Sequence, residues 1–402
     1  TNGDGDFTTT RNTVATRVNE NGLIEEVASN VPRLDYSDGG CPSLLLENSS
    51  TNLMTYSEDF TQWVNTRSSD LSGFISPTGG TNGTKVISDA TVSSSHIIKS
   101  TTFTIASGQK HTYSVFVKAN QLNFARLMFT DSTVSNYLSV YFDLLNGTVG
   151  TSFDAGTATL DSANIENFGN GWYRCSISGD LATTTTASTR IYLAESDNVA
   201  TFDGDGIKSI YAFGAQLEQN SYSTSYIKTV GTTQSRSADT ANGAGNASTF
   251  NDSEGVLMFE IKGLANDGIN RFISVSDGTI NNRINIIFDT SNNISGRQAP
   301  GNVNISTSGV SILNSNKISY KYQNGNQQLW VNGFKIGETS VSTLPSGLDR
   351  LSFDSFNGGD DFYGSAKQIQ YFDSALNDSD LEKITSWTSF TAMANGQSYT
   401  II

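Results

Sequence analysis

The groups in this sequence that could carry out catalysis are few. The only histidines are His96 and His111, and neither lies near a nucleophile motif such as G-x-S-x-G or a zinc motif such as HExxH. Glycosidases built on β-sandwiches need two closely spaced carboxylates, a nucleophile and an acid, but no E-x-D-x-x-E arrangement occurs. We therefore predict that the chain is not an enzyme, with polysaccharide degradation as the minority alternative. Both histidines are interpreted as surface or packing residues.

Two short acidic loops could bind a cation instead. Asp203 and Asp205 belong to a D-G-D-G stretch, and Asp360 and Asp361 are adjacent in a second loop. Carboxylates and carbonyls in loops are the ligands that Ca²⁺ prefers, although neither loop has the EF-hand pattern. We predict calcium at these four positions and keep solvated turn carboxylates as the alternative. No other cofactor is expected.

Aromatic side chains offer a further kind of chemistry, the binding of sugars. Aromatic faces stack on the C–H surfaces of a sugar, while amides and carboxylates bond its hydroxyls. Trp330 has the opposite strand parity to Leu329 and Val331, so it faces outward if those two face the core. Its ring then either stacks on a sugar or is covered by a loop or a subunit. Trp330, Asn332 and Tyr363 are our candidate glycan-binding residues.

The formal net charge of −15 limits the partners of the chain. Such a surface repels phosphate backbones, so we predict no nucleic-acid binding. It also disfavours docking to anionic membranes. No apolar stretch approaches the length of a membrane span and no signal peptide is recognisable, so we predict no membrane insertion. Solubility in salty surroundings explains the charge equally well.

The cysteine count excludes a disulfide framework. Cys41 and Cys175 are widely separated, and no CxxC metal pair is present. We interpret both as buried small hydrophobic residues, while a single bridge between them is left open. The chain begins at Thr1 rather than Met, which we interpret as a processed or trimmed piece of something longer.

The elements that must position these residues are strands. Apolar and polar residues alternate with period two across residues 53–229, for example at 112–117, 138–142, 173–178 and 209–217. Repeated alternation with turns between is typical of an antiparallel β-sandwich, because one face of each strand is buried. We predict one sandwich over residues 53–229, and interpret Trp63 and Trp172 as structural.

A second β-domain is predicted for residues 249–402, after a linker at 230–248. The linker is rich in Gly, Ala, Thr and Ser and has too little apolar bulk to bury itself. Strong strands follow at 255–261, 282–288, 317–322 and 328–333, and Asn377 or Asp378 caps a short late helix. Residues 1–52 form a thin arm with a hairpin turn at 19–22. We expect this arm to pack on a neighbouring subunit or on the domain that follows.

Several spaced motifs fill the first half of the chain: ATRVN at 15–19, GLIE at 22–25, NVPRLDY at 30–36, LLLE at 44–47, TNL at 51–53, GNGWYR at 169–174, GAQLE at 214–218, TSYI at 224–227 and RSAD at 236–239. This series resembles the phage head spike fibre domain of tailed-phage and prophage virion proteins. The resemblance implies an exposed appendage of a virus particle, with other virion proteins as partners, and it identifies no ligand.

The two sandwiches resemble known carbohydrate-binding folds. Residues 53–229 resemble the galactose-binding-like jelly rolls, which include many carbohydrate-binding modules, and Glu58 and Asp59 resemble the position of the structural calcium in those modules. Residues 249–402 resemble the laminin-G or concanavalin A-like lectin fold, through a strand that ends Trp-Val-Asn-Gly and a late helix with Asp380 where that family often has Glu. These folds host lectins, adhesins and glycosidases alike.

The prediction is therefore an all-β protein: an N-terminal arm, a jelly-roll (CBM-like) sandwich and a concanavalin A-like (LamG-like) sandwich. Its predicted function is that of a non-enzymatic spike or fibre exposed on a bacteriophage virion, which binds host-surface glycan for adsorption. Such appendages are commonly symmetric homo-oligomers, and the resemblance implies a trimer. The alternatives are a purely structural capsid or tail decoration and a polysaccharide-degrading enzyme.

Overall fold

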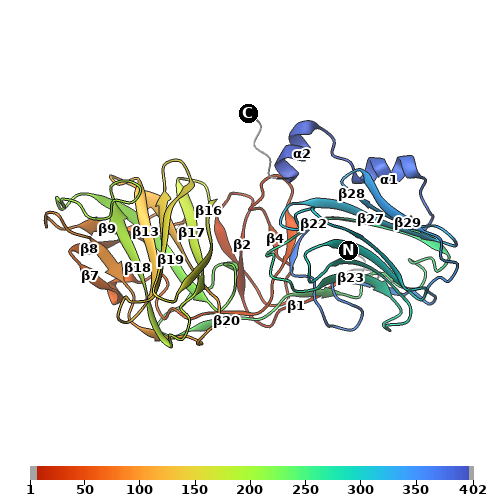
Figure 1. Ribbon diagram of the computed structural model, residues 1–402, viewed down its shortest axis with the longest axis horizontal. Coiled ribbons are helices and arrows are strands. Elements are labelled where there is room, and N and C mark those ends of the chain that lie inside the picture. The colour runs from red at the N-terminus through yellow and green to blue at the C-terminus, as the bar shows by residue number, and fades with distance from the viewer. Residues whose placement is uncertain (1–6, 398–402) are drawn as a thin grey trace.

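The computed structural model describes residues 7–397, in which strands far outnumber helices. Figure 1 shows two β-rich lobes side by side, with the N-terminal arm between them. Each lobe consists of two sheets, the arrangement expected when alternation leaves one face of every strand apolar. The predicted fold class, all-β with two successive sandwiches, is confirmed.

The first sandwich pairs a seven-stranded sheet with a six-stranded one. The strand order is β15-β14-β13-β18-β10-β7 in one sheet, where β11 also pairs with β18, and β16-β17-β12-β19-β9-β8 in the other. The bounds are β7 Val64–Thr66, β8 Ser68–Phe74, β9 Gly83–Ser88, β10 Ile97–Lys99, β11 Phe103–Thr104, β12 His111–Ala119, β13 Phe124–Asp131, β14 Tyr137–Asp143, β15 Thr148–Ala155, β16 Thr159–Asn167, β17 Trp172–Asp180, β18 Thr186–Ala194 and β19 Ser209–Glu218.

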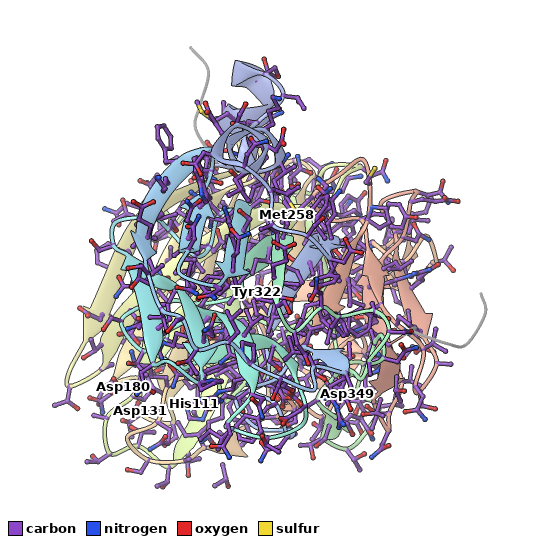
Figure 2. The ribbon with its side chains drawn as sticks, turned by 90° about the vertical axis from the view of Figure 1, so that its right-hand side faces the viewer. His111, Asp131, Asp180, Met258, Tyr322 and Asp349 are labelled. Atoms are coloured by element: carbon purple, nitrogen blue, oxygen red, sulfur yellow. The ribbon has the colours of Figure 1, made fainter. Side chains whose placement is uncertain are left out.

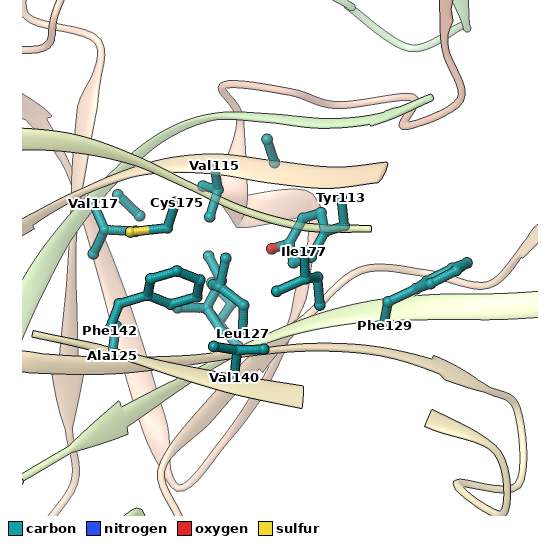
Figure 3. Packing of buried hydrophobic residues seen from close by; sticks show 14 of the residues in the cluster. Tyr113, Val115, Val117, Ala125, Leu127, Phe129, Val140, Phe142, Cys175 and Ile177 are labelled. Carbon is teal, nitrogen blue, oxygen red and sulfur yellow. The ribbon is translucent and has the colours of Figure 1, made fainter. Parts of the chain in front are cut away.

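Alternation along these strands fills the first core (Figure 3). Val115 and Val117 of β12 lie across the core from Leu127 of β13 and Phe142 of β14, and all four side chains are fully buried. Burying one such side chain contributes about 1.5–3 kcal/mol to folding. The other face of the β12 sheet therefore stays free to contact the arm.

The second sandwich takes two of its strands from the arm. The strand order is β29-β28-β27-β22-β31-β5-β4 in one sheet and β26-β25-β24-β23-β30 in the other. The bounds are β4 Leu34–Asp35, β5 Ser43–Leu46, β22 Glu254–Gly263, β23 Arg271–Ser276, β24 Arg283–Phe288, β25 Ile294–Ala299, β26 Val303–Thr307, β27 Asn316–Gln323, β28 Gln327–Val331, β29 Phe334–Thr339, β30 Arg350–Ser352 and β31 Gly364–Phe372. Tyr322, labelled in Figure 2, lies in the core between these sheets.

The arm contacts both sandwiches. Its hairpin of β2 (Ala15–Val18) and β3 (Ile24–Val27) confirms the turn predicted at 19–22, and β5 extends the second sandwich through its pairing with β31. Two further arm strands pair with the segment predicted as a linker: β1 (Thr8–Thr10) with β21 (Thr240–Asn242), and β6 (Ser50–Asn52) with β20 (Gln234–Arg236). The arm thus supplies strand partners for the segment predicted as a linker, and Arg236, Asp239 and Ala241 of that segment are buried.

Helices are short in the described chain. They are the 3-10 turn η1 (Phe60–Gln62), α1 (Asp378–Thr385) and α2 (Phe390–Gly396). Asn377 caps α1, since its side chain accepts a hydrogen bond from the Asp380 N–H, which confirms the predicted cap. None of the helices within 7–397 is long and apolar enough to cross a membrane.

Three sequence interpretations concern single residues of the cores. Trp63 and Trp172 are both buried, as predicted, and Cys175 lies in the first core, where burial raises the pKa of its thiol well above the usual value. The prediction for Cys41 is wrong. Cys41 is exposed in the loop between β4 and β5, and both cysteines are free.

Candidate functional site

The predicted sugar platform Trp330 does not face solvent. Its strand parity is as predicted, because Leu329 and Val331 enter the second core while Trp330 points the other way. The ring is only 6% exposed, however, because it packs under α1 against Leu381. Its Nε1–H donates to Gln328 at 2.9 Å. Of the two alternatives, coverage by the chain itself is the one found, and Trp330 is not part of the proposed site.

The other two candidate sugar ligands lie apart from one another. Asn332 sits in a turn with positive φ, where its Oδ1 accepts from the Lys317 N–H at 3.0 Å and its Nδ2 donates to Asn316. Tyr363 donates its hydroxyl to Asp361 at 3.0 Å. Burial, together with the charge of Asp361, raises the pKa of Tyr363. Both side chains are bonded within the chain.

Two of the predicted calcium ligands are adjacent in sequence and differ in role. Glu58 accepts hydrogen bonds from Asn82 and Tyr226 and forms a 2.9 Å ion pair with Lys228. Asp59 caps η1 by accepting from the backbone and hydroxyl of Thr61. Protein donors therefore already occupy both carboxylates.

The two acidic loops are likewise bonded to their own surroundings. Asp203 accepts from the Ser93 N–H at 2.7 Å, and Asp205 accepts from two backbone N–H groups of its own turn. Asp361 has one oxygen bonded to Tyr363 and one buried oxygen without a partner among the described residues, and burial raises its pKa. Over residues 7–397, no three acidic, His or Cys side chains group as a metal site, so calcium stays a prediction for these loops.

Both histidines are packing residues, in agreement with the prediction. His96 is fully buried, with Nδ1 2.6 Å from the carbonyl oxygen of Arg67 and its ring 4.6 Å from that of Phe202. His111, labelled in Figure 2, packs against Phe129, and burial lowers its pKa. Neither histidine contacts a nucleophile in the described chain.

Five charged residues meet between the sandwiches, and we call them the junction cluster: Arg11, Arg33, Glu47, Arg236 and Asp239. All except Arg11 belong to the spaced motifs of the sequence. All five are at most 5% exposed. Arg33 pairs with Glu47 at 2.6 Å and with Asp239, while Arg11 pairs with the other oxygen of Asp239 at 2.9 Å. Arg236 lies 3.4 Å from Glu47. The cluster joins the arm to the segment between the sandwiches.

Glu47 is ionised within this cluster. Burial opposes ionisation, but the charges of Arg236 and Arg33 and two hydrogen bonds from Ser225 lower the pKa of Glu47 to about 2. Ser225 belongs to the TSYI motif that follows the first sandwich. One carboxylate therefore binds the arm, the end of the first sandwich and the intervening segment together.

A cleft of about 550 Å³ opens beside the junction cluster, and we call it the junction cleft. Its aromatic lining comes from separate segments: Tyr36 from the arm, Phe116 from β12, Phe168 from the turn after β16, and Tyr226 from the segment after β19. The Phe116 and Phe168 rings meet edge to face at 4.8 Å. In Figure 1 the arm, β16 and β17 meet at the centre of the molecule, where these segments converge.

The cleft continues into a second hollow of about 410 Å³ on the second sandwich. The two hollows share five lining residues, among them Ser43 and Lys262, and the second is bounded by Trp387. The Trp387 ring lies 5.1 Å from Lys317 Nζ, and its Nε1 has no hydrogen-bond partner in the described chain. The combined groove has aromatic faces, amides and charges along its length, which suits an oligosaccharide.

Sequence reasoning missed most of this groove. Tyr36 and Arg174 lie inside the spaced motifs, so the motifs marked these residues as notable. The motifs did not show that the residues line a cleft. Trp387 and Phe168 had no such signal. Strand parity does not apply to residues in loops, and nothing local shows that residue 36 approaches residues 168 and 226.

No protein-family model matches the chain, and no curated protein matches it either. Solved structures similar in fold include the IT-sialidase CBM40 of Ruminococcus gnavus, with 17% identity, a TM-score of 0.31 and coverage of 36% of this chain and 94% of that one. Domain 4 of AbnA, a GH43 extracellular arabinanase from Geobacillus stearothermophilus in complex with arabinotriose, has 10% identity, a TM-score of 0.32 and coverage of 37% and 73%. Mouse laminin alpha1 chain domains LG4-5 have 9% identity, a TM-score of 0.26 and coverage of 72% and 90%. At these identities and TM-scores the similarities carry no argument about ligand or activity.

Proposed function

We propose that this chain is a non-enzymatic glycan-binding protein and that the junction cleft holds the glycan. The observation that carries the proposal is the groove itself. It combines the aromatic faces of Tyr36 and Trp387 with amide and charged groups over two adjoining hollows of about 550 and 410 Å³. Few positions in the cleft would suit general acid–base catalysis, since three of its four carboxylates are bonded to cations or to backbone N–H groups, as Asp35 is to Val18, and only Glu166 is left.

The wider role we propose is that of an exposed spike or fibre on a bacteriophage virion, which binds host-surface glycan during adsorption. The resemblance of the nine spaced motifs supports this role. Other virion proteins are the proposed assembly partners, and a homotrimer is the proposed state. Light scattering on the purified chain measures that state directly, and a monomeric mass at micromolar concentration would contradict it.

A glycan array tests the binding proposal. We expect selective binding by the wild-type chain and about a tenfold loss of affinity in Tyr36→Ala, because the ring face is removed. Tyr137→Ala is the matched control, since Tyr137 is also half-buried but lies on β14, away from the cleft. An equal loss of affinity in both variants would contradict the placement of the glycan in the cleft. An array on which the wild-type chain binds no glycan would contradict glycan binding itself.

One observation favours a second candidate, a purely structural decoration of the capsid or tail. Motif residues such as Arg33, Glu47 and Asp239 are bonded in the junction cluster, which is an architectural role. A low-resolution image of the intact particle with this chain labelled, together with a silent array, would support decoration. Release of reducing ends from host polysaccharide would instead establish an enzyme, and a calcium-dependent rise in melting temperature would establish a calcium site.

A further inference from the structure

One buried arginine has no counter-charge among the residues that the structure describes. Five arginines within residues 7–397 are almost completely buried: Arg11, Arg33, Arg174, Arg236 and Arg271. Four of them have a carboxylate oxygen within 4.0 Å, and Arg174 has none. A buried charge without a partner is costly, and folded chains pair such charges unless the site has another use.

The surroundings of Arg174 place its guanidinium at the wall of the junction cleft. Arg174 is 5% exposed on β17 and lines the cleft. One Nη donates to the Ser114 hydroxyl at 3.1 Å, and the guanidinium lies 5.3 Å from the centre of the Phe116 ring. Its Nε is buried with no hydrogen-bond partner among the described residues. The Nη N–H groups that do not bond Ser114 are the donors left for a bound molecule, since the buried Nε is out of its reach.

The other charges that line the cleft are already engaged. Arg17 pairs with Glu25, and Lys262 pairs with Asp38, both at 2.7 Å. Glu47 belongs to the junction cluster, and Asp35 accepts from the Val18 and Ser37 N–H groups. Glu166 is the exception. It is exposed on β16 directly across from Arg174 in the strand pairing, yet it forms no ion pair with it.

We propose that the junction cleft binds a sugar that carries a single carboxylate, such as a uronic acid, and that Arg174 is the counter-ion of that carboxylate. This proposal rests on the proposed glycan-binding function and names the class of glycan. A guanidinium matches the planar carboxylate with two parallel hydrogen bonds, and a partly desolvated site strengthens the attraction. One unpaired cation balances one negative charge. A phosphate monoester would bring nearly two negative charges, one of them unbalanced, to a chain whose net charge is already −15.

The test compares glucuronate with its methyl ester, which has the same ring but no charge. Saturation-transfer NMR with the full chain at constant ionic strength measures the affinity for each sugar. We expect glucuronate to bind at least about tenfold more tightly than the ester, and Arg174→Met to remove that preference. Glu166→Gln is expected to tighten glucuronate binding about twofold to threefold, because a competing negative charge is lost.

Arg126→Met is the matched control. Arg126 is half-buried on β13 in the other sheet, its guanidinium lies 4.8 Å from the centre of the Tyr192 ring, and it also lacks a carboxylate partner within residues 7–397. It is expected to leave glucuronate binding unchanged. Because the ester comparison uses the wild-type chain, it remains informative even if Arg174→Met fails to fold.

The possible failures are distinguishable. If glucuronate and its ester bind equally and Tyr36→Ala weakens both, the cleft binds glycan and the charge assignment is overturned. Equal binding of glucose 6-sulfate and glucuronate would overturn the choice of a carboxylate. Loss of glucuronate binding in Arg126→Met but not in Arg174→Met would overturn the site. If no sugar binds in this assay or on the array, the proposed function fails and this proposal fails with it.

Discussion

The junction cluster and the junction cleft lie side by side, and each contains a buried arginine from a family-like motif. Arg33 comes from NVPRLDY and Arg174 from GNGWYR, and both are at most 5% exposed. Arg33 contacts two carboxylates, whereas Arg174 contacts a hydroxyl and an aromatic ring. Burial alone therefore does not reveal the role of an arginine. The counter-charge separates an arginine that holds the fold from one that is available to a ligand.

Unsatisfied nitrogen atoms do not make this distinction. The Nε atoms of Arg33 and Arg236 are also buried without a hydrogen-bond partner in the described chain, just as that of Arg174 is. Two of these three residues nevertheless have their charge neutralised by Glu47 and Asp239. What distinguishes Arg174 from the other two is that no carboxylate of the described chain lies near its guanidinium.

The largest effect is expected for Arg33→Met. The substitution leaves Glu47 and Asp239 buried with one cation fewer, so we expect the free energy of unfolding to fall by about 3–5 kcal/mol. Denaturant titration measures this loss. Arg17→Met is the control, because Arg17 and Glu25 form a partly exposed pair worth at most about 1 kcal/mol. A loss no larger than the control's would show that the cluster does not hold the sandwiches together.

Acid should weaken the junction cluster through Glu47. The pKa of Glu47 is lowered from 4.5 to about 2, so its contribution to stability is complete above pH 4.5 and is lost as the pH falls toward 2. A depression of this size is worth about 3 kcal/mol. Free energies of unfolding between pH 5 and about 2 measure the loss, and Glu47→Gln should show a flatter profile. An equally steep profile in the variant would contradict this assignment.

A smaller effect is expected at the edge of the cluster. Arg11 pairs with Asp239 alone, whereas Arg33 pairs with both Glu47 and Asp239, so fewer ion pairs are lost when Arg11 is removed. Burial lowers the pKa of Arg11 despite the hydrogen bond to Asp239. We expect Arg11→Met to cost about 1–3 kcal/mol, through lost bonds to Val27 and Ala28 as well as to Asp239. A cost equal to that of Arg33→Met would contradict this ranking.

Much of the fold follows from local sequence patterns. The alternation at 112–117 lies within β12, the turn at 19–22 joins β2 to β3, and Asn377 caps α1 as predicted. These features depend on side-chain period and capping chemistry, which involve only near neighbours. The pairing of β5 with β31 could not be predicted in this way. Leu46 pairs with Gly364, more than three hundred residues away in the sequence. The alternation of apolar and polar residues shows that a segment is a strand, but not which strand it pairs with.

The candidate site was harder to predict for the same reason. The motifs contain Arg33, Tyr36, Glu47 and Arg174, but these motifs lie far apart along the chain and nothing in the sequence links them. Only the fold shows that some of them form a closed charge cluster and others line a cleft. Strand parity gave the direction of Trp330 correctly, yet it could not show that α1 covers the ring.

The smallest effect on stability is expected for Arg174→Met, and it is the sharpest test of the comparison. Because Arg174 has no carboxylate partner in the described chain, its removal leaves no buried charge uncompensated, and a methionine of similar length keeps the contact with Phe116. We expect the free energy of unfolding to change by less than about 1 kcal/mol, or to rise slightly, because an unpaired buried charge is itself unfavourable. The denaturant titration used for Arg33→Met measures the change, with Arg126→Met as the control. A loss of several kcal/mol would mean that Arg174 holds the first sandwich together through Ser114 and Phe116. In that case the two buried arginines would differ in their contacts without differing in their role.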